Sequence, residues 1–121
     1  MKITMEPPLV SIIMGVYNAE ERISNCIESI IKQTYTNWEF IICDDCSSDR
    51  TYEILEEYQN KDNRIKIIRN KKNMKLAVSL NRCLQKANGI YIARMDDDDL
   101  AKSDRLEKQV KFLNEHSIYS V

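Results

Sequence analysis

Glycine, proline and histidine are scarce in this sequence, and the scarcity excludes several kinds of site. The 121 residues include two glycines, two prolines and one histidine. With glycine only at Gly15 and Gly89, neither the dinucleotide pattern G-x-G-x-x-G nor the phosphate-binding pattern G-x-x-x-x-G-K-[ST] is present. Any phosphate must therefore be bound by a metal ion or by cationic side chains.

Long apolar runs and an excess of positive charge are also missing. No apolar stretch approaches the roughly 18 residues that span a bilayer, and residues 1–8 lack the apolar core of a signal peptide. Charged residues make up 31% of the chain and leave a net charge of -1, so no global basic field would attract nucleic acid. We expect a cytoplasmic protein of one domain with no nucleic-acid partner.

Four cysteines occur in the sequence, and we expect reduced thiols because no secretion signal is present. Cys43 and Cys46 form a C-x-x-C pair, which raises zinc or redox chemistry as an alternative. A structural zinc site usually needs a second pair or matched histidines, whereas the single histidine is His116. Buried or incidental thiols are the favoured interpretation.

Short apolar strands alternate with amphipathic helices along the chain. Strands are predicted over residues 10–16, 38–43, 65–68 and 90–95. Apolar spacings of three and four predict helices over 20–33, 52–58, a segment in which Leu76, Leu80, Leu84 and Ala87 share one face, and 103–115. A surface turn is predicted over 59–64, and a helix stop at Asn88-Gly89.

This βαβαβαβα order predicts an α/β fold with a mainly parallel sheet and helices on both faces. Ligands of such sheets bind beyond the carboxyl ends of the strands. Here those ends carry Tyr17-Asn18, Asp44-Asp45 and Asp96 to Asp99. We therefore expect polar and acidic side chains to converge at one edge of the sheet.

Four consecutive carboxylates, Asp96 to Asp99, follow the last predicted strand. Like charges repel, and a bound cation would relieve that repulsion. Mg²⁺ and Mn²⁺ prefer carboxylate and phosphate oxygens, so an Asp-x-Asp on a tight loop could hold a metal that binds a diphosphate. A solvated acidic turn that caps the next helix remains the alternative. A calcium loop is excluded, because Leu100 replaces a ligand and Ala101 replaces the required glycine.

The other polar strand ends allow two interpretations each. The residues Ser47, Ser48 and Asp49 suit helix capping, whereas the paired Asp44-Asp45 could accept hydrogen bonds from a base or ribose. Tyr17 could be an aromatic at the edge of the core or a surface for base stacking. Candidates for binding phosphate, or plain surface charges, are Arg94, Lys75 and Arg69.

Four segments together resemble family 2 glycosyltransferases of the GT-A fold: VSIIMGVYN, WEFIICDDCSSDRT, NMKLAVSLNRCLQKANGIYIARMDDDD and SDRLEKQVKFL. The resemblance lies in their order and spacing. It implies inverting transfer from a nucleoside diphosphate sugar to a glycan or lipid-linked acceptor, with Mg²⁺ or Mn²⁺ as cofactor. It also implies that residues 1–121 are one nucleotide-sugar-binding domain, the N-terminal part of a longer enzyme. Such an enzyme would contact a membrane only peripherally, at its inner face, or through another part of the enzyme.

The resemblance assigns roles by position. Tyr17 would stack on the base, Asp45 would hydrogen-bond to it, and Asp98 would be the likelier direct metal ligand. Asp96 would lie nearer the ribose and belong to the same metal motif, with support from Asp99. The implied nucleotide-binding residues are Tyr17, Asn18, Asp45, Arg94 and Asp96, and the implied metal ligands are Asp98 and Asp96. The general base, an Asp or Glu, is expected beyond Val121.

Some positions depart from the family pattern. Gly15 stands where proline is usual, and Cys46, Lys75 and Cys83 stand where glycine is usual. A side chain at positions 46 and 75 restricts the backbone near the nucleotide. Two alternatives to an enzyme domain are a non-catalytic nucleotide-binding module and, with less support, a phosphoacceptor receiver domain.

Overall fold

The fold is a four-stranded parallel sheet enclosed by helices. The computed structural model describes residues 7–116, and its elements follow the predicted order. The strands are β1 (Val10–Val16), β2 (Trp38–Asp44), β3 (Ile65–Arg69) and β4 (Tyr91–Arg94). The helices are α1 (Ile23–Ile31), α2 (Thr51–Lys61), α3 (Leu76–Lys86) and α4 (Arg105–Glu115). The α/β prediction is confirmed.

The sheet has the strand order β3-β2-β1-β4, and all neighbouring strands are parallel. From β1 the chain moves through β2 to β3, and it then returns to the other side of β1 to form β4. This reversal creates a topological switch point at the carboxyl ends of β1 and β4, where ligands of such folds bind. Receiver domains have the order 2-1-3-4-5, so that alternative is wrong for this chain.

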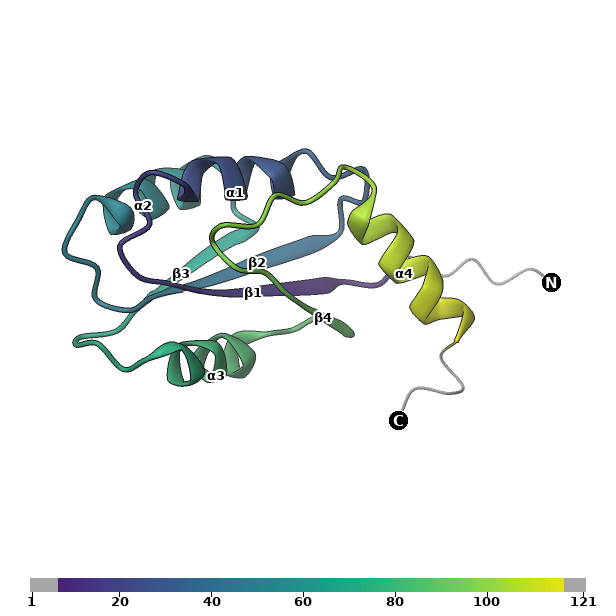
Figure 1. The fold of residues 1–121 in the computed structure, drawn as a ribbon. Helices are drawn as coiled ribbons and strands as arrows, with labels where there is room; N and C mark the ends of the chain where they lie inside the picture. Colours follow the sequence, from purple (N-terminus) through teal and green to yellow (C-terminus); the bar gives the residue numbers. More distant parts are fainter. Residues whose placement is uncertain (1–6, 117–121) are drawn as a thin grey trace.

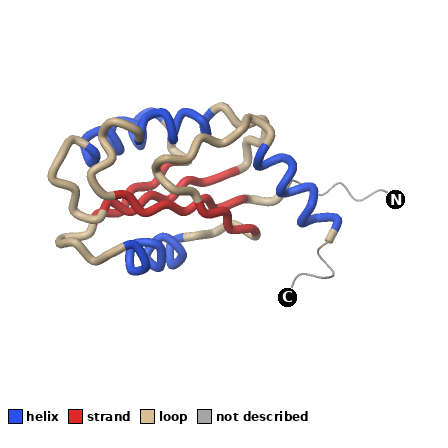
Figure 2. The backbone as a smooth tube through the Cα atoms, in the orientation of Figure 1, coloured by secondary structure: helices blue, strands red, loops and turns tan. Residues whose placement is uncertain are grey.

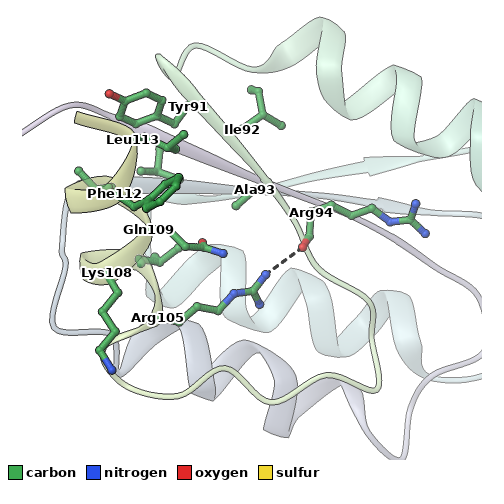
Figure 3. Close-up of a pocket in the computed structure, with 12 residues that line it drawn as sticks. Tyr91, Ile92, Ala93, Arg94, Arg105, Lys108, Gln109, Phe112 and Leu113 are labelled. Carbon is green, nitrogen blue, oxygen red and sulfur yellow. Dashed lines mark hydrogen bonds between the residues drawn. The ribbon is translucent and has the colours of Figure 1, made fainter. Parts of the chain in front are cut away.

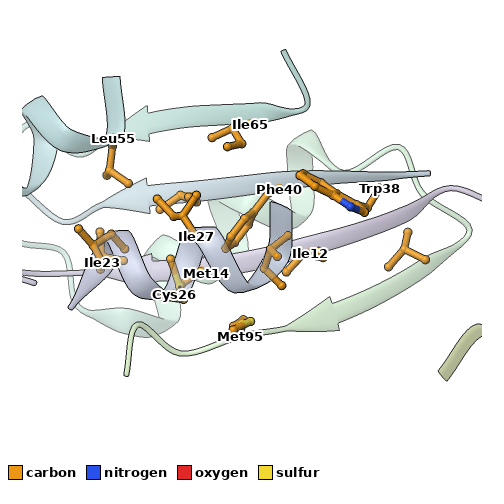
Figure 4. Close-up of a cluster of buried hydrophobic side chains, with 14 of the residues drawn as sticks. Ile12, Met14, Ile23, Cys26, Ile27, Trp38, Phe40, Leu55, Ile65 and Met95 are labelled. Carbon is orange, nitrogen blue, oxygen red and sulfur yellow. Dashed lines mark hydrogen bonds between the residues drawn. The ribbon is translucent and has the colours of Figure 1, made fainter. Parts of the chain in front are cut away.

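Helices cover both faces of the sheet, as predicted (Figures 1 and 2). α1 and α2 lie on one face and α3 lies on the other, while α4 packs at the end where β4 begins. The main core forms between the sheet and α1, from side chains such as Met14, Phe40 and Ile27 (Figure 4). All seven residues of β2 are buried, which explains why its sequence is apolar except at Glu39 and Asp44.

α3 packs on the sheet through two small, fully buried residues and through part of the predicted leucine face. Its fully buried residues are Ser79 and Cys83, whereas Leu76 and Leu84 are exposed. Gly15 on β1 allows the close approach, since a Cβ there would lie 3.3 Å from the Cβ of Ser79. The prediction of the helix was therefore right, but only part of its predicted apolar face, Leu80 and Ala87, packs against the buried residues of the sheet.

α2 is longer than the apolar spacing suggested. It continues to Lys61 through residues predicted as a surface turn. Exposed polar residues remain helical here, and the chain leaves the helix at Asp62, whose side chain accepts the backbone N–H of Arg64 at 3.0 Å. The turn predicted over 59–64 is therefore confined to its second half.

Glu39 is a buried carboxylate at the amino-end side of the sheet. It accepts hydrogen bonds from the Ser11 hydroxyl at 2.5 Å, from Lys66 Nζ at 2.8 Å and from the Asn88 N–H at 2.7 Å. Burial alone raises the pKa of Glu39, but these hydrogen bonds outweigh it and lower the pKa from 4.5 to about 2. The network joins β1, β2 and β3 to the segment that enters β4.

Acid should weaken the fold through this group. Because the pKa of Glu39 is depressed in the folded state, its contribution is complete above pH 4.5 and is lost as pH falls toward 2. We expect the free energy of unfolding of the wild type to fall by about 2 kcal/mol more than that of Glu39→Gln over this range. Urea titrations of both proteins between pH 5 and 2 test this, and parallel curves would contradict it.

Candidate functional site

The loops after β1 and β2 are tied together by hydrogen bonds. The Asn18 N–H donates to Ser47 Oγ at 2.9 Å, and the Ser48 N–H donates to Asn18 Oδ1 at 2.8 Å. Ser47 and Ser48 therefore bridge to the neighbouring loop instead of capping α2, while Asp49 accepts the Thr51 N–H at 2.9 Å from the position before the N-cap residue, Arg50. These ties place Tyr17, which is 47% exposed, at the rim of the sheet rather than in the core.

Asp45 is buried below this rim and is already engaged by three donors. Its Oδ1 accepts Asn70 Nδ2 at 2.9 Å and the Met74 N–H at 2.6 Å, and its Oδ2 accepts the Lys75 N–H at 3.0 Å. It borders a cavity of about 80 Å³ together with Tyr17, Leu76 and neighbouring residues. The structure therefore brings Tyr17 and Asp45 to one hollow at the carboxyl end of the sheet.

Asn70 is a residue that sequence reasoning missed. Predicted only as the start of a polar loop, it is 1% exposed and donates through Nδ2 to Asp45 and to Ser79 Oγ, each at 2.9 Å. Its Oδ1 accepts hydrogen bonds from Arg82 and from the thiol of Cys43. A buried amide with partners on every side fixes the loop that surrounds Asp45.

Lys75 adopts a backbone conformation that glycine favours. Its φ is 74° and its ψ is 163°, and Cys46 also has a positive φ, of 61°. These are two of the positions where the sequence departs from glycine. At Lys75 the conformation directs the N–H toward Asp45 Oδ2, so the strain accompanies the hydrogen bond.

Replacing Lys75 with glycine should stabilise the chain. We expect Lys75→Gly to raise the free energy of unfolding by about 1–2 kcal/mol, because glycine adopts this conformation without a Cβ penalty. Lys75→Ala removes the same charged side chain but keeps Cβ, and it should bring no such gain. Urea denaturation of the three proteins measures this, and an equal gain in the alanine variant would attribute the effect to charge instead.

Three aspartates form a compact cluster after β4. Asp96, Asp98 and Asp99 are exposed, and one carboxylate oxygen of each lies within 4.8 Å of the others. The Asp96 N–H donates to Asp99 Oδ2 at 3.1 Å, and the Asp99 N–H donates to Asp96 O at 3.0 Å, which makes the loop a tight turn. Exposed carboxylates in this arrangement fit a hard divalent cation such as Mg²⁺ or Mn²⁺. No cysteine belongs to this cluster. The thiol of Cys46, from the C-x-x-C pair, instead contacts Lys71 O at 3.6 Å.

α1 and the turn that follows it hold the segment that carries this cluster. The Cys26 thiol donates to Asp96 O at 3.6 Å, Ser29 Oγ accepts the Ala101 N–H at 3.1 Å, and Gln33 bonds to Lys102 O and to the Leu106 N–H. Burial, followed by the charges of nearby aspartates, raises the pKa of Cys26 to about 12, so the thiol keeps its proton. The acidic turn is thus supported by a packed helix. The contacts join residues that are about 70 positions apart in the sequence.

The cationic candidates have different surroundings. Arg94 lies beside the cluster, with Nη2 at 3.3 Å from Asp96 Oδ1. Arg69 is paired with the buried Asp44 at 3.6 Å and stacks on the ring of Tyr52. Lys75 is exposed on the loop next to Asp45. Arg94 is therefore the cation that lies closest to the aspartates among these three.

A larger hollow of about 450 Å³ lies between β4 and α4, and Arg94 is one of the residues that line it (Figure 3). Apolar side chains line much of it, including Ile92, Leu113 and Phe112, and the Arg94 carbonyl accepts a hydrogen bond from Arg105 across it. None of the clustered aspartates borders it. Its lining lacks the carboxylates that a diphosphate-bound cation would need.

Comparison with known proteins identifies the family. Residues 11–121 match the sequence profile described as Glycosyl transferase family 2. The chain belongs to glycosyltransferase family 2. Its resemblance to the family in sequence and its GT-A architecture are thereby confirmed, and no helix within residues 7–116 is long and apolar enough to cross a membrane.

Individual known proteins resemble the chain in sequence or in fold. The chain is 44% identical to WfgD of Escherichia coli, a UDP-Glc:alpha-D-GlcNAc-diphosphoundecaprenol beta-1,3-glucosyltransferase, over 94% of this chain and 44% of WfgD. It superposes on residues 1–349 of S. aureus TarS in complex with UDP-GlcNAc with a TM-score of 0.83 and 31% identity, covering 89% of this chain and 32% of that TarS chain.

A third relative, the mannosyltransferase PcManGT of Pyrobaculum calidifontis, was solved with GDP-Man and Mn²⁺. It matches with a TM-score of 0.82 and 25% identity, over 89% of this chain and 33% of PcManGT. The chain spans less than half of the length of the curated relatives that it matches.

Proposed function

We propose that this chain is the nucleotide-sugar-binding domain of a metal-dependent, inverting glycosyltransferase. The donor is a nucleoside diphosphate sugar, and the acceptor is a glycan or a lipid-linked sugar. The observation that carries this proposal is the cluster of Asp96, Asp98 and Asp99 at the switch point of the sheet, beside the loops that present Tyr17 and Asp45. The nucleotides named for TarS and PcManGT, and the Mn²⁺ of PcManGT, support it.

The residues form two subsites, one for the base of the donor and one for its metal-bound diphosphate. Tyr17 offers an exposed ring on which the base stacks, and the buried Asp45 accepts a hydrogen bond from that base. Asn18 holds the loop between them. On the other side of β1, Asp98 and Asp96 hold Mg²⁺ or Mn²⁺, with Asp99 bracing the turn and Arg94 close enough to contact phosphate.

The reaction needs a negative charge to be stabilised on the departing diphosphate. A divalent cation on the aspartates supplies that stabilisation when it is bound. The acceptor oxygen forms a bond to the anomeric carbon while the bond from that carbon to the diphosphate breaks, and the acceptor proton passes to a carboxylate base. We assign that base and the acceptor site to the part of the relatives that this chain does not span. A lipid-linked acceptor, as in the name of WfgD, would bring the enzyme to a membrane surface.

Calorimetric titration of the 121-residue chain with UDP and GDP, with and without Mn²⁺, tests the proposal. We expect Mn²⁺ to tighten binding of at least one of these nucleotides by about 10-fold or more, and we expect no sugar transfer by the chain alone. Removal of the metal with EDTA should reverse the gain. Absence of metal-dependent binding of any nucleoside diphosphate would overturn the proposal.

A further inference from the structure

The carboxylate of Asp45 has little hydrogen-bonding capacity left for a ligand. An ionised carboxylate accepts about four hydrogen bonds, two on each oxygen. Asn70 Nδ2 and the Met74 N–H both donate to Oδ1, and the Lys75 N–H donates to Oδ2. Oδ1 is therefore saturated, and a single acceptor position remains, on Oδ2.

We propose that Asn70 and the loop at 74–75 make this site selective for a pyrimidine base with an imide N–H, as in uracil, over guanine. Guanine presents adjacent N1–H and N2–H donors, and a carboxylate binds them with both oxygens. Uracil presents one N–H between two carbonyl groups and needs only one oxygen. This inference rests on the proposed function and goes beyond it, because the relatives include donors of both kinds, UDP-GlcNAc for TarS and GDP-Man for PcManGT.

The size of the hollow supports a single-ring base. The cavity that Asp45 borders has a volume of about 80 Å³, and Leu76 is one of the residues that line it. At Gly15 a Cβ would lie only 2.8 Å from Leu76 Cδ1, so β1 and α3 are already in close contact there. A fused two-ring base is larger than a single ring, so it would require the exposed Leu76 side chain to rotate out of the hollow.

Asn70 acts as a positioning residue in this scheme. Its amide is held by Arg82 and Cys43 on the oxygen side and by Ser79 on the nitrogen side, so Nδ2 remains directed at Asp45 Oδ1. Removing the amide frees Oδ1 and lets the carboxylate rotate. Discrimination between bases should then decrease, because both oxygens become available.

Four ligands measured on the wild-type chain with Mn²⁺ test the selectivity without any mutation: UDP, its N3-methyl derivative, GDP and Mn²⁺ alone. Losing a hydrogen bond to a buried carboxylate should weaken binding of N3-methyl-UDP by roughly 10- to 100-fold relative to UDP. GDP should bind at least about 10-fold more weakly than UDP. Equal affinities for UDP and GDP, with Mn²⁺ dependence intact, would overturn the inference and leave the proposed function standing.

Asn70→Ala then tests the positioning role, with Asn81→Ala on the exposed side of α3 as the matched control. We expect Asn70→Ala to weaken UDP about 10-fold while changing N3-methyl-UDP and GDP less than about 3-fold, so both affinity ratios fall. The control should keep all ratios. A uniform loss for all three nucleotides would show that Asn70 only maintains the fold, and the positioning role would be wrong. Failure of every nucleotide to bind wild type would instead overturn the proposed function.

Discussion

The substitution Asp98→Asn should abolish the effect of Mn²⁺ on nucleotide binding. Asp98 is exposed, and its carboxylate lies within 4.8 Å of those of Asp96 and Asp99, so it can donate an oxygen to a shared cation. An amide keeps the size of the side chain but removes the charge that a hard cation requires. Since loss of groups that only support a ligand already costs 10- to 100-fold in metal affinity, we expect a loss on the order of 100-fold or more.

The matched control is Asp97→Asn, the same chemical change one residue away. Asp97 is not part of the cluster, and its carboxylate pairs with Arg22 at 3.1 Å on the side of α1. This variant should retain metal-dependent binding to within about 3-fold, because an exposed ion pair contributes little. Calorimetry of both variants with UDP and Mn²⁺ decides the matter. Equal losses would mean that the acidic segment acts through its total charge and not through a metal site.

The sheet could be predicted from sequence because strands that are buried on both faces consist mainly of apolar residues. β1 and β2 are mostly apolar, and in a parallel α/β sheet their carboxyl ends must meet at one edge. The positions of Tyr17, Asp45 and Asp96 to Asp99 followed from this rule alone. The roles of those residues came from the family resemblance, and they stay predictions.

The supporting contacts could not be predicted, because they depend on distance in space and not on pattern. Asn70 is a polar residue in a polar loop, yet it is buried against Asp45 and Ser79. Ser79 and Cys83 are the fully buried residues of α3, more deeply buried than its leucines, because Gly15 allows the helix to approach. Apolar periodicity reports how hydrophobic each face of a helix is. It does not detect a face that is buried because its side chains are small.

Gly89→Ala should strongly destabilise the chain, although Gly89 was predicted only as a helix stop. Its φ is not positive, so the residue is required for space and not for a left-handed turn. A Cβ would lie 2.6 Å from the backbone nitrogen of Ser11 and 2.8 Å from the carbonyl oxygen of Leu9. Ser11 lies in β1, a central strand of the sheet, and Leu9 immediately precedes that strand. These backbone atoms cannot move aside without disturbing strand pairing.

The clash also reaches the buried carboxylate. The Gly89 N–H donates to Ser11 Oγ at 2.7 Å, and that hydroxyl donates to Glu39. Displacing Gly89 would therefore remove a hydrogen bond from a buried charged network as well as overpack the strand. We expect a loss of about 3 kcal/mol or more in the free energy of unfolding, measured by urea denaturation.

Gly15→Ala provides the comparison, because it adds the same methyl group at the other glycine. There the nearest atom is Leu76 Cδ1, the end of an exposed, flexible side chain, at 2.8 Å, and Ser79 Cβ follows at 3.3 Å. A side chain can rotate away where a backbone cannot, so this variant should lose only about 1 kcal/mol. Equal losses at the two positions would show that the cost comes from replacing glycine itself. The close approach of Gly89 to the backbone of Ser11 would then not be the reason why position 89 needs glycine.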